Sequence, residues 1–208
     1  MAATHKRPEI IALAQDLNGV PMCEQYNPNN PKLLEARHHC RGVTADYNSF
    51  NTKTVSYDQI FAKRLEMLRR VVGKVGDGTF VEPPFLPDYG YTSLVVIGDR
   101  VQIGTNVSIF SAGHDTSILS RQKFVEFGHP VFIEDDCWIG GNVVILPGVR
   151  IGRGSTIGAG SIVTRDVPAF SVAVGSPCRV KKTIPSPEEE ERDPGNPYRV
   201  LVREDREI

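Results

Sequence analysis

The chain has 208 residues, with 24 Lys or Arg against 25 Asp or Glu, so its net charge is −1 and its pI is about 6.5. This balance gives no reason to expect nucleic acid or an anionic membrane as a partner, and no apolar run approaches the ~20 residues of a membrane span. The four cysteines, Cys23, Cys40, Cys137 and Cys178, form no Cys-x-x-Cys pair. Their spacing argues against a zinc or disulfide framework and favours a reduced, cytoplasmic setting.

Residues 1–75 are predicted to form a helical N-terminal module. Apolar residues recur at helical spacing over 56–70, with Ser56 suited to the N-cap and Gly73 to the end of the helix. A second amphipathic helix is predicted over 31–41. Residues 76–91 are rich in Pro and Gly, and we interpret them as the lead-in to the next part of the chain.

A six-residue repeat dominates residues 76–183. Six consecutive hexads open on the aliphatic residues Ile133, Ile139, Ile145, Ile151, Ile157 and Val163, and the same phase occurs upstream at Ile97, Ile103 and Ile109. A period of six fits neither a helix nor a meander of hairpins. It is typical of a chain that runs a short extended stretch, turns a corner and repeats. Three such stretches close one triangular turn, so we expect a mainly β, parallel β-helix whose stacked turns bury a column of Ile and Val.

Two segments depart from the repeat. Residues 111–130 interrupt it and are predicted to be a loop inserted at a corner, where function tends to sit. His114, flanked by Gly113 and Asp115, lies where this loop leaves the repeats. Its imidazole can act as a general base near neutral pH, or it can cap backbone groups at a corner, and the residues alone favour neither role. Residues 184–208 form a charged, acidic tail that we expect to be extended and at most loosely docked.

These features together resemble the left-handed parallel β-helix acyltransferases, and more closely the maltose and galactoside O-acetyltransferase group. The resemblance rests on the hexads, the His114 loop junction, Trp138-Ile-Gly-Gly141 and Gly175-Ser-Pro-Cys-Arg179. In the N-terminal module it rests on Tyr26-Asn-Pro28, Arg37, Tyr47-Asn48 and Glu82-Pro-Pro…Asp88-Tyr-Gly90. The left hand comes from the resemblance, because the general rule for crossovers between parallel strands predicts a right-handed path.

The resemblance implies an acetyl-CoA-dependent O-acetyltransferase that acts on a hydroxyl of a sugar or similar small polyol and needs no metal. His114 matches the catalytic base, which takes the acceptor's proton as the oxygen attacks the thioester in a ternary complex. A backbone N–H near Gly141 is implied as the oxyanion donor. The residues implied to contact acetyl-CoA, the co-substrate, are Trp138, Gly140, Gly141, Ala159, Gly160, Thr164, Arg165, Arg179 and Lys182. Trp138 would line the acetyl and pantetheine site, and the basic residues would lie near the phosphates.

The resemblance also implies a homotrimer in which each site lies between two prisms, with His114 from one chain and Trp138 from its neighbour. Arg37 and Asp88 match positions that face the acceptor sugar. Where the family commonly has Tyr-Asp-Pro-x-Asp, this chain has Tyr26-Asn-Pro-Asn-Asn30, so two acceptor-side charges are absent.

A larger departure follows Tyr91. Relatives usually carry about three more hexads, one full turn, before the hexad matched by Ile97, and that turn helps to form the acceptor pocket. Losing a whole turn preserves the phase of the faces but moves the N-terminal module by about one strand spacing, ~4.8 Å. An alternative interpretation is therefore a catalytically weakened or non-catalytic β-helix protein that binds CoA.

Two further classes share the fold. A metal-dependent hydratase of the γ-carbonic-anhydrase type needs three His on one zinc, whereas the repeat region holds only His114 and His129. Antibiotic-inactivating xenobiotic acetyltransferases generally lack the helical N-terminal module. The sequence therefore favours the sugar-acetylating branch.

Overall fold

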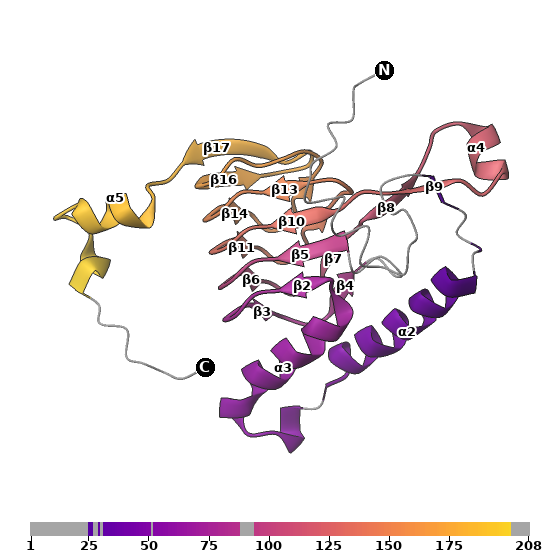
Figure 1. Cartoon of the computed structure of the whole chain (residues 1–208). Coiled ribbons are helices and arrows are strands. Elements are labelled where there is room, and N and C mark those ends of the chain that lie inside the picture. The colour runs from indigo at the N-terminus through magenta and orange to yellow at the C-terminus, as the bar shows by residue number, and fades with distance from the viewer. Residues whose placement is uncertain (1–24, 27–28, 30, 51, 88–93, 201–208) are drawn as a thin grey trace.

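The computed structural model describes residues 25–26, 29, 31–50, 52–87 and 94–200, and its centre is a stack of coils built from three parallel sheets. Successive strands of one coil belong to the first, second and third sheet in turn (Figure 1). The first face holds β2 (Lys74–Val75), β5 (Val95–Ile97), β10 (Val131–Ile133) and β13 (Arg150–Ile151). The second holds β3 (Phe80–Val81), β6 (Gln102–Ile103), β11 (Trp138–Ile139), β14 (Thr156–Ile157) and β16 (Ser171–Val174). The third holds β4 (Phe85–Pro87), β7 (Val107–Ile109), β12 (Val144–Ile145) and β15 (Ile162–Val163).

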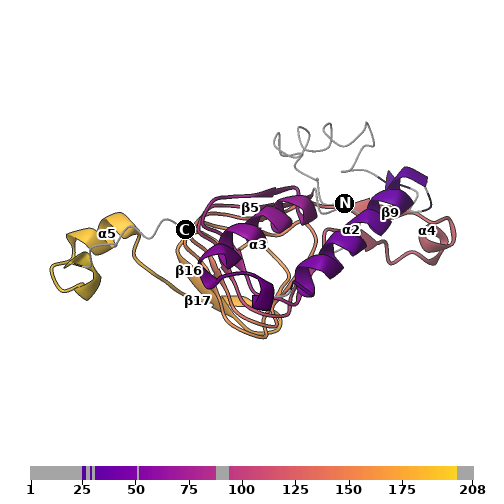
Figure 2. The ribbon, with the colours of Figure 1, turned by 90° about the horizontal axis from the view of Figure 1, so that it is seen from below.

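The interior of the stack is the predicted aliphatic column. The first residue of each hexad pairs in register with the first residue of the hexad one coil away, as Ile97 does with Ile133 and Ile133 with Ile151. All of these side chains are buried, and burying each one stabilises the fold by about 1.5–3 kcal/mol. Viewed along the stack, the coils overlie one another (Figure 2). The repeat therefore specifies the core directly, and the handedness of the coil stays a prediction.

The Pro- and Gly-rich stretch before the repeats forms a coil of its own, which the sequence interpretation missed. Strands β2, β3 and β4 pair in parallel with β5, β6 and β7, so residues 74–87 make the first turn of the stack. Val75 pairs with Ile97, and Pro87 with Ile109, in the same inward phase as the later hexads. The first coil thus begins at Lys74 and rests directly on the second, with no coil between them.

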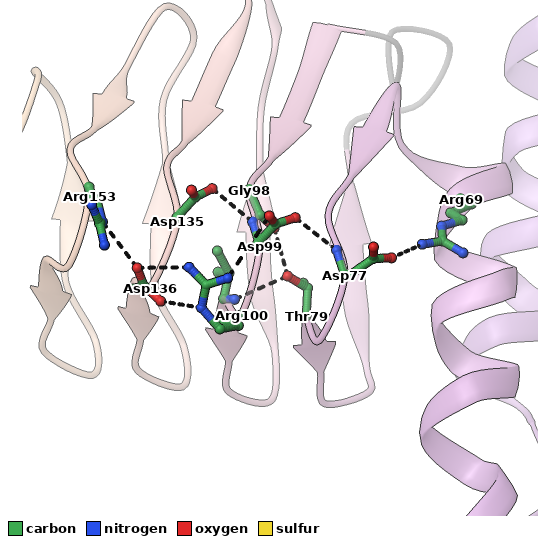
Figure 3. Close-up of polar contacts among 10 residues, drawn as sticks. Arg69, Asp77, Thr79, Gly98, Asp99, Arg100, Asp135, Asp136 and Arg153 are labelled. Atoms are coloured by element: carbon green, nitrogen blue, oxygen red, sulfur yellow. Dashed lines mark hydrogen bonds and ion pairs between the residues drawn. The ribbon is translucent and has the colours of Figure 1, made fainter. Parts of the chain in front are cut away.

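A ladder of aspartates ties the coils together along the edge between the first and second faces (Figure 3). The carboxylate of Asp135 accepts a hydrogen bond from the backbone N–H of Asp99, and the carboxylate of Asp99 accepts one from the N–H of Asp77, each at 2.9 Å. Arg69 of the N-terminal module pairs with Asp77 at the end of the ladder. Exposed ion pairs beside it join Arg100 and Arg153 to Asp136.

Two helices, α2 (Pro31–Asn48) and α3 (Tyr57–Val71), cover the end of the stack formed by the first coil (Figures 1 and 2), with a short 3-10 turn, η1 (Thr52–Thr54), between them. The Tyr47 hydroxyl donates to the carbonyl of Val81, and the Asn48 amide both donates to and accepts from the backbone of Phe85. These contacts lie on β3 and β4, the edge strands of their sheets. Helix α2 extends seven residues beyond the predicted 31–41, because its last turns bury side chains against the first coil.

The C-terminal part turns back and then leaves the stack. Strand β17 (Arg179–Thr183) runs antiparallel to β16 at the end of the second face. Beyond it, α5 (Pro187–Arg192) begins with a capping box formed by Ser186 and Glu189, buries no residue and lies apart from the coils (Figure 1), and a 3-10 turn, η3 (Pro197–Val200), follows. The predicted extended tail thus contains a short helix. Across the described ranges, no helix combines the length and apolarity that a membrane crossing requires.

Candidate active site

The predicted loop at 111–130 is a small antiparallel sheet that projects from the edge between the third and first faces (Figure 1). Strands β8 (Ala112–His114) and β9 (Glu126–Gly128) form a hairpin, and β1 (Gln25–Tyr26) pairs with the other edge of β9. At the tip, α4 (Ile118–Gln122) is capped by Ser117, whose hydroxyl accepts from the N–H of Ser120. The insertion is therefore ordered by its own pairing and by a strand from the N-terminal module.

His114 lies at the end of β8, directly opposite Glu126 on β9. Because residues paired in this way project from the same face of a sheet, their side chains meet, and Nε2 of His114 is 3.4 Å from Oε1 of Glu126. The other oxygen, Oε2, accepts a hydrogen bond of 2.9 Å from Nη2 of Arg37, on α2. The side chain of His114 is 51 % exposed, whereas those of Glu126 and Arg37 are 14 % and 20 % exposed. An accessible imidazole thus stands beside a mostly buried ion pair.

This arrangement unites two predicted residues and adds one that the sequence interpretation missed. Arg37 is predicted to face the acceptor. Its guanidinium lies near the His114 imidazole because both groups contact the carboxylate of Glu126, although 89 residues separate Arg37 from Glu126. Glu126 carries no motif of its own. Only the hairpin register, which depends on where α4 turns the chain, places it opposite the imidazole. Asp88, the other predicted acceptor-side residue, lies outside the described residues.

Trp138 lies on the second face, and the residue is 58 % exposed. Register across the strands places it in one row with Thr156, Val172 and Lys182. Three strand spacings separate Trp138 from Lys182, about 14 Å. Arg179 lies on the same strand as Lys182 and is also exposed. The predicted pantetheine end and the predicted phosphate end of the acetyl-CoA site therefore share one face.

The predicted glycines follow Trp138 at the edge between the second and third faces. A Cβ built on Gly140 would lie 2.6 Å from the backbone nitrogen of Ala159, so close stacking of coils already requires glycine there. Gly160 adopts a left-handed φ of 70°, which favours glycine for a second reason. Gly141 is less constrained, since its Cβ would lie 3.2 Å from the carbonyl oxygen of Thr105. A ligand-contacting role for these residues stays a prediction.

Thr164 and Arg165 are exposed and follow β15 on the edge from which the His114 hairpin also departs. This edge is shared by the third and first faces, whereas Trp138 lies on the second face, across the stack. Figure 2 shows the hairpin and strands β16–β17, which belong to the face of Trp138, on opposite sides of the stack. One chain therefore divides the predicted site residues between two distant surfaces.

The other side of the hairpin carries an open hollow of ≈ 340 Å³, lined mainly by Leu119, Val125 and Phe127 with Asp115 and Lys123. Phe127 follows Glu126 in the same strand, so its side chain points to the opposite face of the sheet. The hollow is thus separate from the His114–Glu126 pair. In the part of the chain that the structure describes, no three His, Cys, Asp or Glu side chains gather as a metal site would need.

The coils and the hairpin-borne imidazole define a protein of the hexapeptide-repeat transferase class. Residues 130–165 match the family model described as "Bacterial transferase hexapeptide (six repeats)", and residues 24–76 match the "Maltose acetyltransferase hexapeptide capping motif". The second match covers the two helices that close the stack.

Comparison with individual proteins narrows the class. The chain is 32 % identical over 180 residues to the galactoside O-acetyltransferase of Lactococcus lactis, covering 77 % of this chain and 84 % of that one. The crystal structure of a maltose O-acetyltransferase from Clostridium difficile 630 shares 36 % identity with a TM-score of 0.65, over 78 % of this chain and 94 % of that one. A galactoside acetyltransferase in complex with coenzyme A shares 32 % identity with a TM-score of 0.61, over 78 % and 88 %. The chain belongs to the galactoside and maltose O-acetyltransferase family, and it is an acetyltransferase.

Proposed function

We propose that this acetyltransferase moves the acetyl group of acetyl-CoA to a hydroxyl of a sugar or similar small polyol, with His114 as the general base. Family membership supports the reaction class, and the coenzyme A bound in a related structure supports the co-substrate. The observation that carries the role of His114 is its placement: an accessible imidazole on a projecting hairpin, 3.4 Å from a carboxylate. No metal has a part in the proposed reaction.

In the proposed ternary complex, His114 takes the proton of the acceptor hydroxyl as that oxygen attacks the carbonyl carbon of the thioester. A backbone N–H near Gly141 stabilises the oxyanion that forms. When the C–S bond breaks, the CoA sulfur leaves with the proton returned by the imidazolium, and the new C–O bond completes the ester. Glu126 stabilises the positive charge that the ring carries between these two proton transfers.

We further propose that the active unit is a homotrimer with its sites between neighbouring chains. His114 and Trp138 lie on surfaces that face away from each other in one chain, so a site that needs both requires two copies. The outward row on the third face supports such contact, because Leu86, Val144 and Ile162 make it largely apolar and Leu86 is 45 % exposed. A cyclic trimer would use the same two surfaces three times and leave neither unpaired.

Within such a site, one chain would present His114 together with Thr164 and Arg165. The neighbour would present the row from Trp138 to Lys182. Acetyl-CoA would then lie along the second face of that neighbour, with its thioester near Trp138 and its phosphates near Arg179 and Lys182.

The experiment that tests this proposal mixes two variants, His114→Ala and Trp138→Ala. We expect His114→Ala alone to lower acetyl transfer about 10²–10⁴-fold, and Trp138→Ala to lower kcat/KM for acetyl-CoA about tenfold, consistent with lost aromatic contact. After denaturation and refolding of a 1:1 mixture, about a quarter of the sites in random trimers combine an intact His114 with an intact Trp138. Activity well above that of either variant alone supports a shared site. No recovery in refolded mixtures, with wild-type protein recovering fully, would contradict it, and near-wild-type activity of His114→Ala would end its role as base.

The alternative of a weakened or non-catalytic CoA-binding protein has one observation in its favour. The first coil rests directly on the second, so the stack has no extra coil between Pro87 and Val95 that could shape the acceptor pocket. The same assay decides this point. Coenzyme A binding by calorimetry without turnover on sugars, glycosides and polyols would favour the alternative.

A further inference from the structure

The hairpin tip, residues 115–125, exposes apolar side chains around the hollow on the face opposite His114. Helix α4 buries none of its residues, and Leu119 and Phe124 are 60 % and 58 % exposed. The hollow of ≈ 340 Å³ is lined mainly by apolar side chains, Leu119 among them, and Lys123 contributes a positive charge to its lining. Apolar side chains that gather around a hollow on the surface mark a contact site for another protein surface.

The C-terminal arm, residues 184–200, has secondary structure of its own but buries none of its helix. Helix α5 begins with a capping box, so its first turn is specified within the arm itself. The arm carries five acidic residues against two basic ones, and four of the acidic residues are consecutive, at 188–191. Its one aromatic side chain, Tyr198, is 72 % exposed. The arm thus presents both negative charge and an aromatic ring to a partner.

The charges of these two segments are complementary. The hairpin tip carries Arg121 and Lys123 against Asp115, whereas the arm has an excess of three negative charges. Within the tip, the Arg121 guanidinium donates to backbone carbonyls, and these contacts do not neutralise its charge. Opposite charges favour association and fix its orientation, even where each exposed pair adds little stability. An acidic arm therefore suits this surface better than a basic or neutral segment does.

The arrangement of the two segments requires a second chain for their contact. Figure 2 shows α4 and α5 on opposite sides of the stack, so the tip and the arm of one chain do not meet. In Figure 1, α4 lies level with β17 along the stack, and β17 leads into the arm. Chains that pack side by side around an axis along the stack keep this level. The tip of one chain can therefore meet the arm of the next.

The proposed shared site brings the tip and the arm to the same edge. Trp138 opens β11, and Lys182 lies in the same row near the end of antiparallel β17. Both residues therefore lie beside the edge between the first and second faces, from which the arm leaves the stack. Helix α4 begins four residues after His114 and α5 five residues after Lys182, so at most ~14 Å and ~18 Å of chain separate them. A neighbour that places His114 at Trp138 also brings its hairpin tip to the arm.

We propose that the C-terminal arm of one chain docks on the hairpin tip of its neighbour in the trimer. Glu190 and Glu191 lie against Lys123, and the ring of Tyr198 enters the apolar hollow, where an aromatic side chain gains the most from burial. This inference rests on the proposed homotrimer with shared sites and adds a contact outside the site. Docking there holds the hairpin that carries His114 against the chain that supplies the acetyl-CoA surface.

The first test asks which chain supplies each partner. Carbodiimide joins a lysine amine to a carboxylate in contact with it, and an equal mixture of ¹⁴N- and ¹⁵N-labelled full-length chains is refolded together before treatment. We expect peptides that link Lys123 to Glu190 or Glu191 and that combine one light and one heavy chain. Lys63, exposed on α3, is the matched control and should form no such link. Links within one chain only, or equal yields from Lys63 and Lys123, would overturn the inference.

The second test reverses the charges. Lys123→Glu, and separately the double variant Glu190→Lys with Glu191→Lys, should each raise about tenfold the protein concentration at which half of the trimer has dissociated. Like charges then face each other. Combining all three substitutions should return this concentration to within about threefold of wild type. Tyr198→Ala should raise it about tenfold through the lost ring contact, and Lys63→Glu should leave it unchanged. Sedimentation velocity over a dilution series measures each value.

The outcomes separate this inference from the proposed function. An active wild-type trimer whose dissociation none of these substitutions changes would overturn the docking of the arm and leave the shared site standing. Failure of the combined charge reversal to restore the trimer would also overturn it. A fully active wild-type monomer would remove both the shared site and the docking.

Discussion

The stack of coils and the hairpin that projects from it differ in how deeply their side chains are buried. In the stack, side chains such as Ile139 and Ile145 are fully buried and paired in register with their equivalents one coil away. In the hairpin, by contrast, Ile118 at the tip is 67 % exposed and His114 is half exposed. Stability therefore resides in the repeated interior, and the insertion is free to carry chemistry because the stack does not depend on it.

The free energy of unfolding should differ most between the two regions when the same substitution, Ile to Ala, is made in each. Ile139→Ala should lower the free energy of unfolding by about 3 kcal/mol, because it removes a buried side chain and leaves a cavity between coils. Ile118→Ala should change it by less than about 0.5 kcal/mol. Urea denaturation at one fixed protein concentration measures both values. Similar losses in the two variants would show that the hairpin tip is packed against another surface and would contradict the assignment of stability to the stack.

A smaller loss of stability is expected at the end of the stack, where helix α2, and not another coil, covers the edge strands of the first coil. The Asn48 side chain bonds to both the N–H (2.8 Å) and the carbonyl (2.9 Å) of Phe85 on edge strand β4. Asn48→Ala should cost about 2 kcal/mol, because it removes two hydrogen bonds from a partly buried backbone. Ser49→Ala is the matched control, since that hydroxyl bonds only within its own helix. Equal denaturation midpoints for the two variants would contradict the capping role of Asn48.

The smallest effect depends on pH. Burial raises the pKa of the Tyr47 hydroxyl, which donates to the carbonyl of Val81. A raised pKa in the folded state means that the phenol contributes its full stability below the unfolded-state pKa of about 10 and loses it as the pH rises further. Tyr47→Phe should therefore cost about 1 kcal/mol at pH 8 and remove part of the decline above pH 10.

Denaturation curves at pH 8 and pH 10.5 measure this change, with Tyr198→Phe, an exposed phenol, as control. An unchanged alkaline decline in Tyr47→Phe would assign the pH dependence to other groups. Cys137 is the first alternative, since burial raises the pKa of its thiol to about 11.

The sequence interpretation failed at the first coil for a reason visible in the residues. Val75-Gly76-Asp77 repeats the pattern of Ile97-Gly98-Asp99, and Val81 and Pro87 continue at intervals of six. The phase was present, but Pro and Phe replaced the aliphatic residues that make later hexads conspicuous. Helix α2 was predicted too short because its last turns are specified by contact with this coil.

The buried interior of this protein could be predicted from the sequence alone because a period of six is a local property. Each hexad carries its own inward-facing residue and its own corner. For the same reason, the sequence alone predicted that His114 lies where the inserted segment interrupts the repeats. Only the tertiary structure decided that Glu126 faces the imidazole and that Arg37 supports it, because those contacts depend on the turn of the hairpin and on the docking of a helix from the N-terminal module. It also decided that His114 and Trp138 lie on opposite sides of one chain, since the face on which a residue lies is set by the closure of the coils.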